Sequence, residues 1–219
     1  MSKLVFGVGV YEKGKYRAKV DGKNTREYGL WKGMLRRCYD PKFQEKRPTY
    51  KGCSVCGEWL NFQVFADDIN GMIGLNEKEG SRYFHLDKDI LKPNNKIYSK
   101  ENCVFVPNSL NGFFTNKASN KGDLPTGVCF HKRDKKYIVR MRKFGKKEHL
   151  GLFTDLSEAE KVYNKHREYY AAELVEKFDS LVDDRVIKRL ISHSENIQEN
   201  NEVYGMIEPY DLNRILVRR

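Results

Sequence analysis

One segment, residues 131–149 (HKRDKKYIVRMRKFGKKEH), constrains the fold of this chain more than any other. It carries nine Lys or Arg residues against two acids. Successive side chains of a β-strand point to opposite faces, and the middle of the segment alternates accordingly. The apolar set is Tyr137, Val139 and Met141, and the opposite set is Lys136, Ile138, Arg140 and Arg142. The segment therefore predicts a strand with one face on a core and the other presenting cations.

The residues around this strand predict a small α+β domain. The expected elements are strands at 127–132, 136–142 and 147–153 and a helix at 157–178. Ser157 and Glu160 form a capping-box pattern at the start of that helix. We expect a three-stranded antiparallel sheet packed on one long helix, within a domain of residues 126–180.

The composition favours a polyanionic partner. The 219 residues include 41 Lys or Arg and 30 Asp or Glu, a formal net charge of +11. Such a surplus repels itself unless a polyanion offsets it, and we expect double-stranded DNA, with an anionic membrane surface as the alternative. No apolar stretch approaches the roughly 20 residues of a membrane span, no signal peptide is evident, and five cysteines do not suggest a secreted disulfide framework. We expect a cytoplasmic, reduced protein.

The basic segment and its helix resemble the Apetala-two, or ethylene-response-factor, DNA-binding domain over about residues 127–170. The shared pattern is Gly-Val at the start, K-Y-x-V-R in the second strand, H-L-G-x-F closing the third, and S-E-A-E-x-x-Y in the helix. The resemblance implies that the sheet enters the major groove while the helix backs it. The candidate DNA contacts are Lys132, Arg133, Lys136, Arg140, Arg142 and Lys147. The alternative is a solvated basic face.

The first half of the chain predicts short helices and strands. The expected elements are a hairpin over 7–20, helices at 28–38 and 58–70, strands at 85–91 and 102–107, and a short helix after Pro107. Residues 118–125 are the predicted linker, so that 1–117 form the first domain. Residues 181–219 are expected to be a charged tail with one helix near 182–192.

Residues 28–117 resemble phage-encoded HNH proteins, including homing endonuclease-like ones. Asp87-Lys88 stands where the HNH pattern has Asp-His, Asn102 lies at the following turn, and Asn111 lies nine residues beyond it. W31-K-G-M-L-R-R-C-Y and V55-C-G-E-W-L-N-F also resemble segments of those proteins. The resemblance implies a ββα-metal core in which Asp87 and Asn111 hold Mg²⁺ or another divalent cation for DNA cleavage.

The chain departs from the HNH pattern at the general base. A neutral imidazole with a pKa of about 6.5 suits that task, whereas a lysine with a pKa of about 10.4 stays charged beside carboxylates and phosphate. Lys88 would suit a phosphate clamp better, and His85 is a candidate substitute that shares strand parity with Asp87. The alternatives are an ordinary strand histidine at 85 and ordinary ion pairing by Asp87 and Asp89.

The cysteines allow two interpretations. Cys53 and Cys56 have zinc-like spacing, and Cys38 and Cys103 would complete a four-thiolate site of the kind some HNH-type enzymes carry. Because no second C-x-x-C is present, buried free thiols are the default interpretation.

These patterns lead to one hypothesis and two alternatives. The hypothesis is a phage-type HNH-like protein that binds duplex DNA and, if active, nicks or cuts it, with Asp87 and Asn111 on the metal and His85, Lys88 or Asn102 assisting. The first alternative is a catalytically inactive DNA-binding protein on a degenerate HNH core. The second is an interaction protein that binds another acidic macromolecule. The sequence predicts no oligomeric state and no target site.

Overall fold

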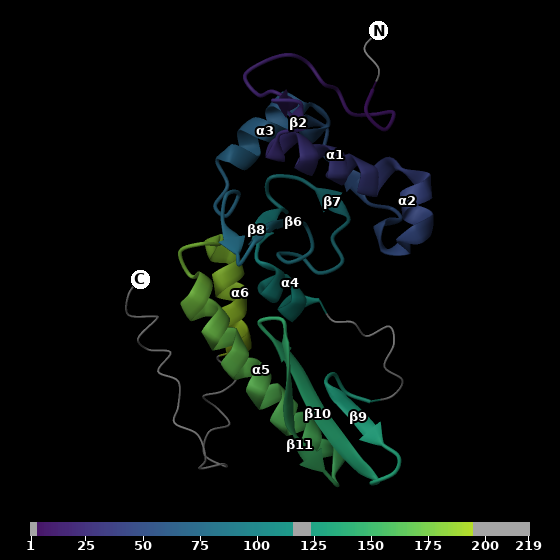
Figure 1. The fold of residues 1–219 in the computed structure, drawn as a ribbon, viewed down its shortest axis with the longest axis vertical. Helices are drawn as coiled ribbons and strands as arrows, with labels where there is room; N and C mark the ends of the chain where they lie inside the picture. Colours follow the sequence, from purple (N-terminus) through teal and green to yellow (C-terminus); the bar gives the residue numbers. More distant parts are fainter. Residues whose placement is uncertain (1–3, 116–123, 195–219) are drawn as a thin grey trace. The chain divides into compact units, whose positions relative to one another are not determined.

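The computed structural model describes residues 4–115 and 124–194. Helices and small sheets alternate along the described chain (Figure 1). The chain divides into two compact units. The first holds the residues up to Pro107 together with Leu181–Asp183, and the second holds Asn108–Ser180 together with the residues from Asp184 onward.

The first unit contains short helices and four two-stranded pairs. The helices are α1 (Arg26–Tyr39), α2 (Pro41–Lys46) and α3 (Phe62–Asn70), with 3-10 turns η1 (Pro48–Tyr50) and η2 (Glu58–Leu60). The strand pairs are β1 (Lys19–Val20) with β2 (Lys23–Asn24), β3 (Ser54–Val55) with β7 (Ile97–Tyr98), β4 (Lys78–Glu79) with β5 (Arg82–Tyr83), and β6 (His85–Asp87) with β8 (Val104–Val106). The β3–β7 pair is parallel and the other three are antiparallel.

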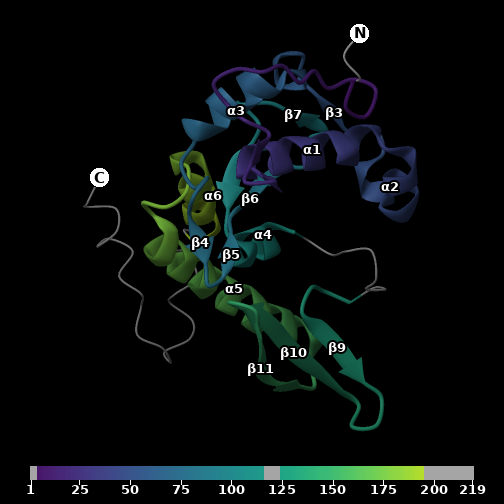
Figure 2. The ribbon, with the colours of Figure 1, turned by 45° about the horizontal axis from the view of Figure 1, so that its top comes forward.

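Helices α1 and α3 pack on each other and supply much of the core of the first unit (Figure 2). The helix predicted at 28–38 is confirmed by α1, and the one at 58–70 corresponds to η2 followed by α3. The buried side chains of α1 are Trp31, Met34, Leu35 and Cys38. Asn61 separates η2 from α3, because its side chain accepts the N–H of Gln63 and caps α3. Trp31 and Phe62 are fully buried, with ring centroids 5.5 Å apart.

The predicted hairpin over residues 7–20 is wrong. Val10 instead bridges Asn61 in parallel, and the N–H of Phe62 donates to the Val10 carbonyl at 3.0 Å. The loop at 12–16 is closed by Gln63, whose amide donates to the carbonyls of Glu12 and Tyr16 at 2.9 Å each. The turn residues at 12–15 are real signals, but a tertiary contact with α3 decides their conformation.

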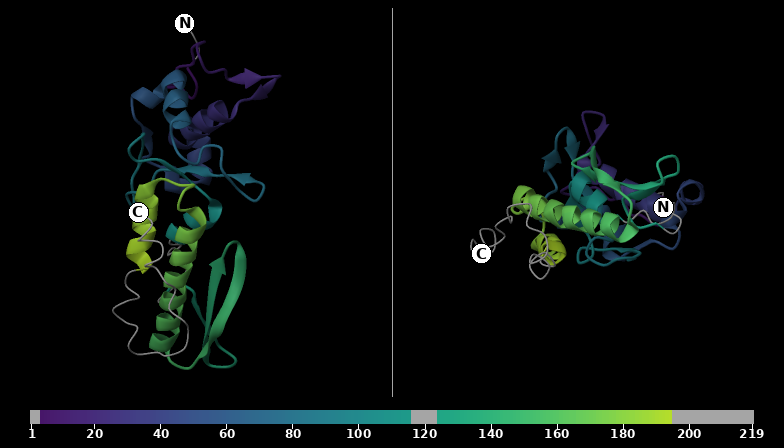
Figure 3. Two further views of the ribbon diagram at one scale, coloured as in Figure 1. Left: turned by 90° about the vertical axis from the view of Figure 1, so that its left-hand side faces the viewer. Right: turned by 90° about the horizontal axis from the view of Figure 1, so that it is seen from below.

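The second unit is a sheet on a long helix with two further helices. Its elements are α4 (Asn108–Phe114), β9 (Val128–His131), β10 (Lys136–Lys143), β11 (Lys146–Phe153), α5 (Leu156–Phe178) and α6 (Asp184–Ser194). The strand order is β11-β10-β9, all antiparallel, and α5 lies along one face of the sheet (Figures 1 and 3). The predicted sheet and long helix are confirmed, and α6 matches the helix expected near 182–192.

The core between the sheet and α5 is a compact apolar cluster. Its buried members are Val128, Val139 and Ala159, and its partly buried members are Tyr137, Leu150, Phe153, Leu156 and Tyr163. Because Leu156 packs in this cluster, α5 begins there, and Asp155 caps it by accepting the N–H of Glu158 at 2.8 Å. The predicted capping box of Ser157 and Glu160 is therefore wrong, because Asp155 and not Ser157 caps the helix.

The division into units also differs from the predicted domains. The main segment of the first unit ends at Pro107, so α4 belongs with the second unit rather than with the domain predicted for 1–117. Most of the predicted linker at 118–125, and the tail beyond Ser194, lie outside the described residues. None of the helices in the described ranges is long and apolar enough to cross a membrane.

Candidate nucleic-acid interface

The sheet face directed away from α5, called the outer face below, carries most of the cations predicted to contact DNA. Val139 and Met141 of β10 are buried toward α5. Lys136, Arg140 and Arg142 of the same strand are exposed. The predicted alternation of β10 is thus confirmed.

The strand register extends this outer face onto both neighbours of β10. Directly opposite residues of paired strands share a face. On the outer face the opposite pairs are Lys136 with His131, Arg140 with His149, Arg142 with Lys147, and Ile138 with both Cys129 and Leu152. Basic and imidazole side chains therefore flank an apolar centre.

A β-bulge places the residues of β11 on these faces. The register shifts between Val139 and Arg140, so Leu150 is the extra residue, and it packs in the inner cluster. A regular strand would have put Lys147 and His149 inside and the acid Glu148 outside. Instead Glu148 is opposite Met141, on the inner side. The bulge therefore removes a carboxylate from the outer face and adds a lysine and a histidine.

Glycine is required next to the bulge. Gly151 has φ +145, and a Cβ there would meet the ring of Phe153 at 2.7 Å. The backbone conformation favours glycine, and any larger residue would also displace the Phe153 ring. The H-L-G-x-F pattern seen in the sequence thus has a structural cause, because it turns Lys147 and His149 outward.

The cations of the outer face lack acidic partners within the described residues. No ion pair there joins Lys136, Arg140, Arg142 or Lys147 to a carboxylate. Lys143, which is next along β10, differs because it pairs with Glu173 of α5. The N–H of Phe144 also donates to the hydroxyl of Tyr170 at 3.0 Å. The end of β10 is thus fixed to α5 while its outer arginines stay unpaired.

The β9–β10 turn carries a mixed charge. Asp134 lies 3.0 Å from Nε of Arg133 and 3.1 Å from Nδ1 of His131. Lys132 lies in the same turn and is exposed. Of the six predicted DNA contacts, Arg133 is therefore the one that an acid already neutralises in part.

The segment that resembles an HNH core has the expected order of elements. β6 and β8 pair antiparallel, and α4 follows directly after Pro107. Asp87 ends β6, and its Oδ1 accepts the N–H of Asp89 at 2.8 Å and of Ile90 at 2.9 Å. Burial raises the pKa of the Asp87 carboxyl above its ordinary value. Oδ1 of Asp87, a predicted metal ligand, is thus already hydrogen-bonded to the backbone that follows β6.

Lys88 is buried rather than directed at solvent. Its side chain is 5% exposed, and its ammonium donates to the carboxylate of Asp89 and, at 2.8 Å, to the carbonyl of Asn95. Asn95 in turn donates to the carbonyl of Lys88 at 2.8 Å. These contacts give Lys88 a structural role in the loop between β6 and β7. Because the Lys88 ammonium is buried and already hydrogen-bonded within the loop, its position does not suit a general base or a group that binds phosphate.

The other predicted catalytic and metal residues lie on separate elements. His85 is exposed on β6, and Asn102 lies in the turn before β8, where its N–H donates to the Ser99 carbonyl at 3.3 Å. Asn111 is on α4 in the second unit, and its Oδ1 accepts the Thr115 hydroxyl at 3.2 Å. The predicted metal ligands Asp87 and Asn111 thus belong to different units. The donors of the first unit do not form a divalent-cation site by themselves.

The cysteines do not gather into a zinc site. Within residues 4–115 and 124–194, no three His, Cys, Asp or Glu side chains are grouped to hold a metal ion. Cys38, Cys53 and Cys103 are buried and Cys56 is half-buried, all as free thiols. Burial raises the pKa of Cys38 to about 12 and also raises the pKa of Cys56 and of Cys103. Burial therefore keeps these cysteines as neutral thiols.

Sequence reasoning missed His131 and His149 on the outer face. His149 was undetectable by strict alternation, because the bulge reverses its side. His131 can be assigned to the outer face only from its pairing with Lys136, and that pairing requires the strand register.

The chain was compared with protein-family models, with curated proteins and with solved structures, and no match was found in any of the three comparisons.

Proposed function

We propose that this protein binds double-stranded DNA through the outer face of the β9–β10–β11 sheet. The observation that carries the proposal is the row of unpaired cations on that face, namely Lys136, Arg140, Arg142 and Lys147. The register aligns them on one side of a ribbon whose other side is packed on α5. A formal net charge of +11 agrees with a polyanionic partner.

The dimensions of the ribbon suit the major groove. Same-face side chains along a strand are about 6.8 Å apart, and the groove is about 12 Å wide, enough to admit a two-stranded ribbon. Arginine can bind phosphate oxygens or the edge of guanine with two parallel hydrogen bonds. Arg140 and Arg142 are therefore proposed as the central contacts, with Lys136 and Lys147 on phosphates.

The salt dependence of duplex binding tests this proposal. If the four lysines and arginines each neutralise one phosphate, the log–log slope of affinity against salt is expected to be about −3.6. A gel-shift titration of a mixed-sequence duplex at several salt concentrations measures the slope. Weak affinity that does not change with salt would refute the proposal and favour an acidic protein as the partner.

A second candidate function, metal-dependent nicking, is favoured by the β6–β8–α4 order alone. The assay is incubation of supercoiled plasmid with the protein and Mg²⁺ or Mn²⁺. Asp87→Asn is the informative variant, because an amide oxygen can still accept the N–H groups of Asp89 and Ile90 while the charge is lost. Nicking that disappears in Asp87→Asn, with the gel shift unchanged, would establish this function. Plasmid that stays supercoiled at high protein leaves duplex binding as the function.

A further inference from the structure

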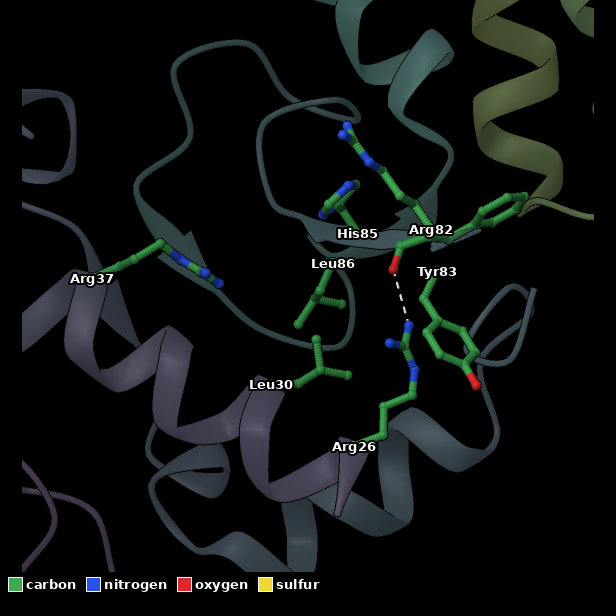
Figure 4. Close-up of a pocket in the computed structure, with 8 residues that line it drawn as sticks. Arg26, Leu30, Arg37, Arg82, Tyr83, His85 and Leu86 are labelled. Atoms are coloured by element: carbon green, nitrogen blue, oxygen red, sulfur yellow. Dashed lines mark hydrogen bonds between the residues drawn. The ribbon is translucent and has the colours of Figure 1, made fainter. Parts of the chain in front are cut away.

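An arginine-lined cleft lies in the first unit, separate from the sheet. Its volume is about 320 Å³, and its walls come from α1 on one side and from β5 and β6 on the other (Figure 4). The charged or titratable side chains that line it are Arg26, Arg37, Arg82 and His85. Among the residues that the structure describes, no acidic side chain lines it. A cleft with three guanidinium groups and no carboxylate favours an anion.

Arg26 is held in the cleft by neutral groups. Its Nε donates to the Leu75 carbonyl at 2.8 Å. Its Nη2 donates to the Phe84 carbonyl at 3.0 Å, and its guanidinium lies 4.1 Å from the centroid of the Tyr83 ring (Figure 4). Burial lowers the pKa of Arg26 below its ordinary value. An anion in the cleft would offset that cost of burial, which no ion pair within the described residues does.

Arg37 and Arg82 also lack a carboxylate partner among the described residues. Nε of Arg37 donates to the hydroxyl of Tyr98 at 3.0 Å, a neutral acceptor. Its neighbour Arg36 differs, since it lies 3.5 Å from Asp40. Arg82 and His85 are exposed on β5 and β6. The donors that line the cleft are therefore of the kind that bind phosphate oxygens.

The face of α1 that borders the cleft also contains glycine. Gly33 is three residues after Leu30 and four before Arg37, so it shares their helix face. A Cβ at Gly33 would meet only Nη1 of Arg37, at 3.8 Å, and a Cβ at Gly29 would meet nothing within 4 Å. Glycine in a helix interior costs about 0.5–1 kcal/mol relative to alanine, and here packing does not require it. The absence of a side chain at Gly33 leaves room for a ligand to approach the helix backbone closely.

We propose that this cleft binds a phosphate group, with Arg37 and Arg82 as donors and Arg26 as the fixed positive charge. Gly33, on the same face of α1 as Leu30 and Arg37, leaves the helix backbone beside the cleft open. The two sources of that group are the backbone of a nucleic-acid strand and a free phosphate anion. The site is independent of the sheet. If both proposals hold, the chain contacts nucleic acid through each of its units.

The test uses the full chain with Arg140→Ala and Arg142→Ala, which removes the central contacts of the sheet. A labelled single-stranded oligothymidylate is the probe, and fluorescence anisotropy measures its affinity. Gly33→Leu and Arg82→Glu are each expected to weaken binding about tenfold, equivalent to one charge-assisted hydrogen bond. Lys42→Glu, an exposed residue of α2 outside the cleft, makes the same charge change as Arg82→Glu and is expected to alter affinity less than twofold.

Thermal unfolding separates binding from folding in the same variants. Leucine is a better helix former than glycine by about 1 kcal/mol, so Gly33→Leu is expected to keep or raise the Tm while binding falls. Arg82→Glu gives an independent answer if Gly33→Leu unfolds. Unchanged affinity in Arg82→Glu, or an equal loss in Lys42→Glu, would overturn the proposal.

Competition identifies the source of the phosphate group. Displacement of the probe by inorganic phosphate at millimolar concentration assigns the cleft to a free anion, and displacement by unlabelled oligothymidylate alone assigns it to a nucleic-acid strand. No binding in the sheet variant refutes the cleft and leaves the sheet proposal intact. Duplex affinity that is unchanged in that variant relative to the unsubstituted chain refutes the sheet proposal instead.

Discussion

Replacing Arg140 and Arg142 together with alanine is expected to weaken duplex binding by roughly 10²- to 10³-fold. Each arginine that contacts a base edge or a phosphate contributes about 1–3 kcal/mol, and every tenfold change in affinity corresponds to about 1.4 kcal/mol. The log–log salt slope should also become shallower by about two, because two phosphate contacts are lost. Both side chains are exposed and unpaired, so the substitutions should leave the Tm nearly unchanged.

The control is a variant with the same charge change elsewhere in the second unit. Lys161 of α5 and Lys188 of α6 are exposed. Lys161→Ala with Lys188→Ala lowers the net charge by the same amount and should reduce affinity only a few-fold. Gel shifts with one duplex at one salt concentration compare the two variants. Equal losses would show that total charge, and not the outer face, governs binding.

The parts of the fold that sequence predicted well are those with a regular period. α1 and α5 have apolar residues at helical spacing, and β10 alternates strictly between apolar and basic residues. Each of these signals is local, because the period repeats within the element itself. The same locality made the three-strand order predictable, since short turns connect neighbouring antiparallel strands.

The errors arise where a distant residue decides the local structure. The turn residues at 12–15 predicted a hairpin, but Gln63 of α3 holds that loop. Leu156 extends α5 beyond the predicted start, because it packs in the core of the second unit. Neither contact has a local sequence period. In both cases tertiary packing outweighed a weak local preference.

The candidate site likewise has residues that the local sequence pattern predicts and residues that only distant contacts determine. Alternation along β10 identified Lys136, Arg140 and Arg142 as neighbours on one face. It could not place His149, since the bulge at Leu150 changes the face of every residue before it in β11. The arginine cleft was also beyond prediction, because its side chains come from α1 and from strands far along the chain. The burial of Lys88 likewise depends on Asn95 and was not visible in the sequence.

Gly127→Ala is expected to destabilise the second unit by about 3 kcal/mol and to lower its Tm by more than about 10 °C. Gly127 has φ +80, and a Cβ there would lie 2.1 Å from the ring of Tyr163 and 2.9 Å from the carbonyl of Arg140. The carbonyl of Gly127 also accepts the N–H of Arg140 at 2.9 Å, beside the bulge. The substitution should therefore weaken duplex binding as well, because Arg140 loses its backbone support.

Gly145→Ala separates the steric cost from the conformational cost of the same substitution. Gly145 has φ +82, close to that of Gly127, but a Cβ there would meet nothing within 4 Å. Alanine at Gly145 should cost only the backbone strain, about 1 kcal/mol, and leave duplex affinity unchanged. In a Tyr163→Ala background the cost of Gly127→Ala should shrink toward that value, because the ring that blocks the Cβ is gone. Thermal unfolding of the four variants measures this coupling. Equal costs at the two glycines would mean that the contact with Tyr163 does not constrain the start of β9.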